Sequence, residues 1–140
     1  MRRWLLWPAV ATAVILASGC GGGEKQATRQ VAVTMRDTEF TPDRLEVAAG
    51  ETVGFVFTNA GQAEHEAVIG DQKLQLSQEA GGSDSHAAGH QGSDKVARVV
   101  LSPGRTGKLT YTFDEPGEVL IGCHVPGHWT AGMKAIVTVT

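Results

Sequence analysis

The sequence lacks a large excess of charge and is only mildly acidic. Its 140 residues include 12 lysines and arginines and 15 aspartates and glutamates, which gives a formal net charge of −3 at pH 7. No part of the chain forms a basic stripe, the usual mark of a surface that binds nucleic acid. We therefore expect no nucleic acid partner. The length allows one domain, and 18 glycines fit a compact fold with many turns.

A helical period of useful length is also missing. Apolar residues instead alternate with period two, in short segments separated by turn signals such as Thr41-Pro42-Asp43 and Glu115-Pro116-Gly117. Short strands at this spacing predict an all-β fold, an antiparallel β-sandwich. The residues that share a face in the successive segments are Val31, Val33 and Met35; Leu45 and Val47; Val53, Phe55 and Phe57; Leu109, Tyr111 and Phe113; Val119, Ile121 and Cys123; and Ala135, Val137 and Val139.

The long apolar run lies at the start of the chain. Two arginines precede apolar residues 4–17, which are too few for a comfortable membrane span, so residues 1–19 are expected to form a secretory signal peptide. Residues 16–20, Leu-Ala-Ser-Gly-Cys, resemble the lipobox of bacterial lipoproteins, although Ala17 stands where leucine is usual. We expect acylation of Cys20. An ordinary signal cut after a small residue, or an uncleaved anchor, is the alternative.

Cysteine is scarce: the sequence has two, Cys20 and Cys123. An exported protein with two cysteines would by default be expected to form one disulfide. Cys20 lies at the edge of the signal, however, and Cys123 lies within a pattern of metal ligands, so we expect no disulfide. Residues 20–30 have no apolar periodicity and predict a flexible tether. It would join a lipid-bearing Cys20 to a domain at residues 31–140.

Near the C-terminus the chain places a thiol, an imidazole and a thioether at the spacing Cys-x4-His-x4-Met, in Cys123, His128 and Met133. Thiolate and thioether are soft ligands that favour Cu(I), and imidazole also satisfies Cu(II). A trigonal site of two imidazoles and one thiolate needs a second histidine, and the best candidate is His65. Because Cys123 shares a face with Ile121, we expect its sulfur to point inward between the sheets.

The segment around His65 and the segment from Cys123 to Met133 together resemble those of the cupredoxins, the small blue-copper proteins such as plastocyanin and azurin. The resemblance covers about residues 31–140, apart from one insertion, and implies a Greek-key β-sandwich. It also implies one copper ion in a type 1 site. The in-plane ligands would be His65, Cys123 and His128, and Met133 would be the weak axial ligand.

The same resemblance implies electron transfer, with copper cycling between Cu(II) and Cu(I) on the periplasmic or extracellular face of a membrane. A redox partner protein would dock near the exposed edge of His128, on an apolar rim of Val125, Pro126 and Trp129. Plain packing is the alternative role of these three residues. We expect a monomer that is not an enzyme. Copper handling, meaning storage, delivery or resistance, is the alternative function.

The alternation stops between about residues 71 and 95. Residues 72–78 fit either a short strand or a helical turn, and the remainder has too few apolar residues to pack, which predicts a flexible insertion. His86 and His90 lie in it at a spacing that would let them share an ion on a helix. An auxiliary metal site and a solvated loop with incidental histidines are both open, and the nearby glycines favour the loop.

Two other interpretations of the ligand pattern are weaker. Structural zinc prefers four nitrogen or sulfur ligands and does not use thioether, so Met133 argues against zinc. The loop also resembles the His-Cys-His segment of multicopper oxidases, but Gly122 replaces the first histidine. The five histidines of the chain are too few for a type 1 site and a trinuclear cluster together.

Two neighbours of the ligands need roles of their own. His124 is expected beside the site rather than in it, because adjacent residues on a strand face opposite sides. Glu66 follows His65, and a carboxylate close to copper would stabilise Cu(II) and lower the potential.

Overall fold

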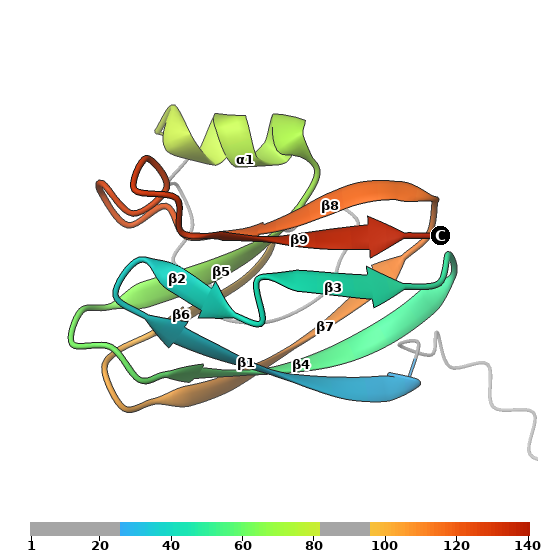
Figure 1. Ribbon diagram of the computed structural model, residues 1–140, viewed down its shortest axis with the longest axis horizontal. Coiled ribbons are helices and arrows are strands. Elements are labelled where there is room, and N and C mark those ends of the chain that lie inside the picture. Colours follow the sequence, from blue (N-terminus) through green and yellow to red (C-terminus); the bar gives the residue numbers. More distant parts are fainter. Residues whose placement is uncertain (1–25, 82–95) are drawn as a thin grey trace, which may run out of the picture.

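The computed structural model describes residues 26–81 and 96–140, which form two β-sheets packed face to face (Figure 1). The sheets have the strand orders β2-β1-β4-β7 and β3-β9-β8-β5-β6. The predicted all-β sandwich is therefore confirmed. The strands are β1 (Arg29–Arg36), β2 (Glu39–Thr41), β3 (Arg44–Val47), β4 (Glu51–Asn59), β5 (His65–Gly70), β6 (Ala97–Leu101), β7 (Thr106–Phe113), β8 (Gly117–Gly122) and β9 (Lys134–Val139).

The sheets are mixed rather than purely antiparallel, which corrects the expected strand arrangement. Strand β1 pairs with β4 in parallel, with Val33 beside Phe57, and β3 pairs with β9 in parallel, with Leu45 beside Val137. A period-two pattern shows which side chains face the core, but it does not show the direction in which two distant strands pair. The alternation could therefore predict the faces of these strands and not their partners.

The domain begins slightly before residue 31. Strand β1 starts at Arg29, and the backbone N–H of Thr28 already donates to the carbonyl of Thr52 at 2.8 Å. The side chains of residues 28–30 are exposed. They join the sheet through backbone hydrogen bonds, which an apolar pattern does not signal.

The core lies between the two sheets and consists of the inward-facing residues of the alternating segments. Phe55 and Phe57 of β4 stack with their ring centroids 5.6 Å apart, and Phe113 of β7 meets Phe55 edge-on at 6.3 Å. Aromatic rings in such contact contribute the largest apolar areas to a core. The other large, fully buried apolar side chains are Val33, Met35, Phe40, Val53, Ile69, Ile121 and Met133.

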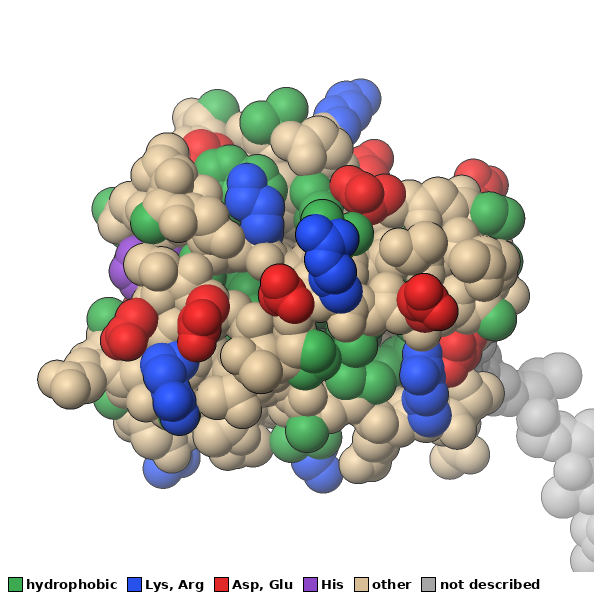
Figure 2. Space-filling model, viewed as in Figure 1, with side chains coloured by type: hydrophobic (Ala, Val, Ile, Leu, Met, Phe, Trp, Pro, Cys, Tyr) green, Lys and Arg blue, Asp and Glu red, His purple; other side chains and the backbone are tan. Residues whose placement is uncertain are grey.

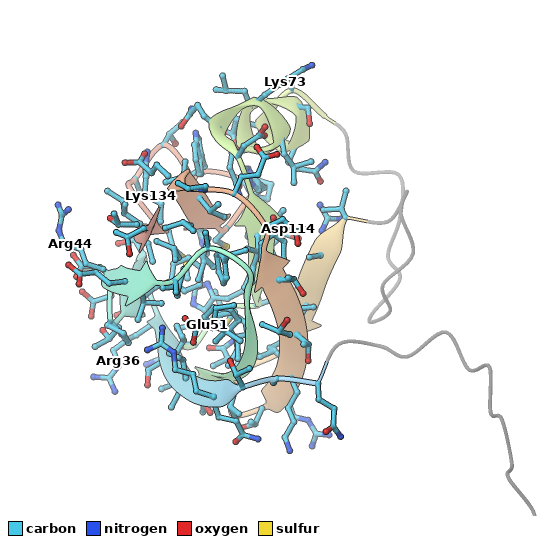
Figure 3. The ribbon with its side chains drawn as sticks, turned by 90° about the vertical axis from the view of Figure 1, so that its right-hand side faces the viewer. Arg36, Arg44, Glu51, Lys73, Asp114 and Lys134 are labelled. Carbon is cyan, nitrogen blue, oxygen red and sulfur yellow. The ribbon has the colours of Figure 1, made fainter. Side chains whose placement is uncertain are left out.

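Helix α1 (Gln72–Glu79) covers the outer face of the five-stranded sheet (Figure 1). It begins after Asp71, whose Oδ1 accepts a hydrogen bond from the Leu74 N–H at 2.7 Å and so caps the helix. Lys73 points away from the sheet (Figure 3), whereas Gln75 and Gln78 are buried against it. Of the two alternatives open for residues 72–78, the helical turn is therefore the one that forms, and the insertion predicted as flexible at about residues 71–95 needs correction there. A helix that buries amide side chains shows no apolar period in its sequence, so periodicity could not predict it.

Positive and negative side chains are interspersed over the face of the molecule that Figure 2 shows. Opposite charges also pair directly: Arg29 Nε lies 2.7 Å from Glu51 Oε1. This face therefore carries no single-sign patch of the kind that binds nucleic acid.

Several predictions concern residues outside the described ranges: the signal peptide at residues 1–19, acylation at Cys20, most of the tether, and metal capture by His86 and His90. In the described part of the chain, no helix is long and apolar enough to cross a membrane.

Replacing Phe55 by alanine should lower the free energy of unfolding by about 3–5 kcal/mol, because it opens a cavity where three aromatic rings meet. Denaturation of the metal-free protein in guanidinium measures this change. Val56 is half-buried on the other face of the same strand. Its replacement by alanine should reduce the unfolding free energy by about 1 kcal/mol or less. Equal losses in the two variants would contradict this placement of the core.

Candidate metal centre

Two neighbouring strands bring predicted ligands to one end of the sandwich. His65 is the first residue of β5, and Cys123 follows directly after β8. The two strands are antiparallel, with Val68 opposite Gly122, so the start of β5 and the end of β8 lie together. The register of the sheet thus sets an imidazole beside a thiol from a distant part of the chain.

Two nitrogen donors and one sulfur donor converge at this end. His65 Nδ1 lies 3.2 Å from His128 Nδ1, and His128 Nδ1 lies 3.5 Å from Cys123 Sγ. The ligating atoms of the three residues all lie within 4.8 Å of one another. Two atoms that each bind one ion at about 2.0–2.3 Å are roughly 3–4 Å apart. These three residues therefore fit a shared metal ion.

A short loop adds His128 and Met133 to the two strands. The Met133 N–H donates to the His128 carbonyl at 2.9 Å, and the Cys123 N–H donates to the Met133 carbonyl at 3.2 Å. Gly127 and Gly132 make the turns, with φ of 87° and 97°, values that glycine adopts without strain. Met133 is fully buried within this loop. Its assignment as an axial ligand stays a prediction.

The segment before His65 is shaped to hold the imidazole. Asn59 Nδ2 donates to the carbonyls of Ala63 and Leu101, each at 2.8 Å, and its Oδ1 accepts from the Gly61 N–H at 2.9 Å. Leu101 is the strand partner of His65 on β6. A Cβ at Gly61 would lie 2.8 Å from His65 Nε2, so glycine leaves the room that the ring needs.

The donors differ in their access to solvent. His65 and Cys123 are fully buried, and His128 is half-buried. Cys123 is a free thiol. An electron or an ion that enters from outside would therefore meet His128 first.

Burial shifts the titration of the two enclosed donors. The pKa of His65 lies below its ordinary value because of burial first, and then because of the nearby His128. Burial raises the pKa of the Cys123 thiol, although backbone N–H groups of Glu66 and Val125 oppose the rise. Without metal, the imidazole is neutral with a free lone pair and the thiol keeps its proton at pH 7. Metal binding must therefore release the thiol proton and should strengthen as the pH rises.

Glu66 does not present a free carboxylate to the site. Its Oε1 accepts a hydrogen bond from the His124 N–H at 3.0 Å, and its Oε2 lies 3.4 Å from Arg98 Nε. The Glu66 N–H lies 3.5 Å from Cys123 Sγ and donates to it. Because Arg98 matches the negative charge, this geometry does not support a strong lowering of the potential by Glu66.

The predicted apolar rim is only partly at the surface. Pro126 is exposed and Val125 is half-buried, but Trp129 is 8% exposed. The ring of Trp129 stacks on His124 at 4.9 Å between centroids, and the Lys134 ammonium lies 4.2 Å from the Trp129 ring centre. For Trp129 the structure favours the packing role that the sequence left open.

Sequence reasoning missed three buried polar residues that lie behind the site. Gln75, Gln78 and Arg98 are buried polar side chains on α1 and β6. Each is a residue type that usually lies on the surface. A single sequence carries no signal that they are buried. Asn59, by contrast, is part of the sequence pattern Asn-x-Gly-x3-His that precedes and includes His65, and the sequence already pointed to it.

Known proteins resemble this chain in sequence and in fold. A family model described as a cupredoxin-like domain matches residues 8–137. A copper-resistant cuproprotein CopI from Pseudomonas aeruginosa is 33% identical over 81% of this chain and 77% of that protein. One from Rubrivivax gelatinosus is 34% identical over 86% of this chain and 72% of that protein. Among solved structures, auracyanin B aligns with a TM-score of 0.70 and 23% identity, covering 84% of this chain and 93% of that chain. This structural likeness shows the fold alone.

Replacing Gly61 by alanine should destabilise the metal-free protein by about 1–3 kcal/mol, because the new methyl group overlaps the ring of His65. Chemical denaturation measures the loss, and the NMR shifts of the His65 ring report its displacement. Gln62 is exposed in the same loop. Its replacement by alanine should change neither quantity. An unmoved His65 ring in the Gly61 variant would show that the loop does not confine it.

Proposed function

The chain belongs to the cupredoxin-like domain family, and on this basis we propose that it binds one copper ion in a mononuclear type 1 site. His65, Cys123 and His128 would hold the ion, and Met133 would be a weaker fourth ligand. The observation that carries this proposal is the convergence of two imidazole nitrogens and a buried thiol within 4.8 Å. Thiolate, imidazole and thioether together suit both oxidation states of copper.

We propose electron transfer as the function of the site. Bound copper supplies one-electron chemistry between Cu(II) and Cu(I). The protein contributes ligands that are fixed before the ion arrives: His65 by strand β5, and Cys123 and Met133 by backbone hydrogen bonds across the loop. Ligands that move little when the charge changes keep the reorganisation small. Burial of Cys123 also protects the thiolate from oxidation.

His128 is half-buried, so the electron would enter and leave the site through its ring. We propose that a redox partner protein docks over this ring, against the exposed Pro126 and the half-buried Val125. The chain acts there as a monomer and performs no catalysis of its own. It works outside the cytoplasm, held to a membrane through a lipid on Cys20.

Copper handling is the second candidate function. Two relatives of 33% and 34% identity are named copper-resistant cuproproteins, and their matches cover 81% and 86% of this chain. In this alternative the same four residues hold the ion for storage or delivery. The name of a relative describes that relative, so the two functions must be separated by experiment.

Replacing Cys123 by serine should abolish the intense blue absorption of the copper-loaded protein, because that band arises from charge transfer between thiolate and copper. Replacing Met133 by leucine should keep the band and raise the redox potential, since loss of the thioether weakens the ligands of Cu(II). Visible spectra and voltammetry measure both effects. Thr130 is exposed in the same loop, and its alanine variant should behave as the wild type. An unchanged spectrum in the serine variant would refute the ligand assignment.

Retention of copper through redox cycling separates the two functions. An electron-transfer protein should keep its ion over many reductions in the presence of an excess of a Cu(I) chelator, because its fixed ligands hold both oxidation states. Voltammetry followed by metal analysis measures the copper that remains. Rapid loss of the ion to the chelator after the first reduction would instead favour copper delivery.

A further inference from the structure

A layer of buried polar side chains lies behind the site, between helix α1 and the outer face of the five-stranded sheet. Gln75 is fully buried, and Gln78, Glu66 and Arg98 are each 9% exposed. Burying such groups is unfavourable unless each finds hydrogen-bond or ionic partners. Their partners include backbone carbonyls of β5, which begins with His65, and of β8, which leads to Cys123.

Glycines allow α1 to approach the sheet closely. A Cβ at Gly70 would collide with the side chain of Leu74, and a Cβ at Gly122 would collide with Gln75 Oε1. The Gly122 Cβ would also lie 2.8 Å from Trp129 Cζ3. Gly70 ends β5 and Gly122 ends β8, so the helix packs on the two strands that position the enclosed donors.

The amide of Gln75 joins both strands to the residue after the thiol. Its Nε2 donates to the carbonyls of Val68 on β5 at 3.0 Å and Leu120 on β8 at 3.1 Å. Its Oε1 lies 2.7 Å from His124 Nε2. Because the Nε2 group faces two carbonyls, the orientation of the amide is fixed and Oε1 must accept from His124.

His124 is fixed on several sides. Its side chain is 4% exposed, its Nδ1 lies 3.1 Å from Glu79 Oε2 on the same helix, and its ring stacks on Trp129. Its backbone N–H donates to Glu66 Oε1 at 3.0 Å. The helix therefore holds the ring of the residue next to Cys123, and Glu66 holds its backbone.

A second connection runs from α1 to Glu66. Arg98 on β6 donates to Gln78 Oε1, and its Nε lies 3.4 Å from Glu66 Oε2. The backbone N–H of Glu66 donates to Cys123 Sγ, at 3.5 Å. Both chains of contacts from the helix, one through His124 and one through Arg98, thus reach residues next to Cys123 Sγ.

We propose that helix α1 holds the copper site in place, as a clamp, from outside the sandwich. Gln75 is the positioning residue. It acts through His124 and keeps the Glu66 N–H directed at Cys123 Sγ. This inference rests on the proposed function for its effect on copper. A hydrogen bond to the thiolate withdraws electron density from sulfur and so favours Cu(I). Loosening the clamp weakens this bond and lowers the redox potential.

Replacing Gln75 by leucine tests the clamp, because leucine fills similar space without the amide. The matched control is Gln72→Leu, the same change at an exposed position of the same helix. Two quantities are measured on the full chain: the redox potential of the copper-loaded protein, and the hydrogen exchange of the Glu66, Cys123 and His124 amides in the metal-free protein.

We expect Gln75→Leu to lower the potential and to speed exchange of these three amides by about tenfold, the loss expected for one or two hydrogen bonds. The control should change neither. Exchange at wild-type rates would overturn the proposal. Faster exchange throughout the domain with an unmoved potential would also overturn it, since that result describes a merely structural residue.

The experiment also covers a variant that does not fold and a wild type that binds no copper. If Gln75→Leu does not fold, His124→Phe removes the bond to Gln75 while keeping a ring against Trp129, and the same two measurements apply. If the wild type takes up no copper, the proposed function fails. The exchange rates of the metal-free variants then decide whether the clamp exists.

Discussion

The antiparallel pairing of β5 with β8 is the constraint on which the rest of the site depends. It sets His65, which begins one strand, beside Cys123, which follows the other. Sheet hydrogen bonds fix this relation to within a residue, because a slip of one position would turn each side chain to the opposite face. The loop from Cys123 to Met133 then needs only to return His128 to the same point, and its internal hydrogen bonds do so.

A buried site of this kind encloses polar groups, and the structure offsets that cost differently on its two sides. On the inner side, the thiol keeps its proton and the His65 imidazole stays neutral, so no isolated charge is enclosed before metal binds. On the outer side, Glu66 faces Arg98, and the Gln75 amide has a partner for each of its groups. The same bonds that satisfy these groups also restrain the Cys123 backbone. Stability and site geometry are therefore linked through α1.

Much of this arrangement follows from the sequence. Alternating residues such as Val119, Ile121 and Cys123 determine that the sulfur faces inward, and the Cys-x4-His-x4-Met spacing selects the loop. The pairing of β1 with β4 could not be derived, because side-chain alternation carries no information on the direction of a distant partner. The sequence could not decide between a strand and a helical turn at residues 72–78, because α1 buries Gln75 rather than apolar residues. The sequence left both docking and packing open for Trp129, since its partners His124 and Lys134 become neighbours of the ring only when the loop folds.

The central claim is that one thiolate and two imidazoles share a single copper ion. X-ray absorption at the copper edge, on the full chain loaded with one equivalent of Cu(II), tests this claim most directly. The account predicts one short copper–sulfur distance and two copper–nitrogen distances from imidazole, with the sulfur contribution lost when Cys123 is replaced. A spectrum with only oxygen and nitrogen neighbours around copper would contradict it.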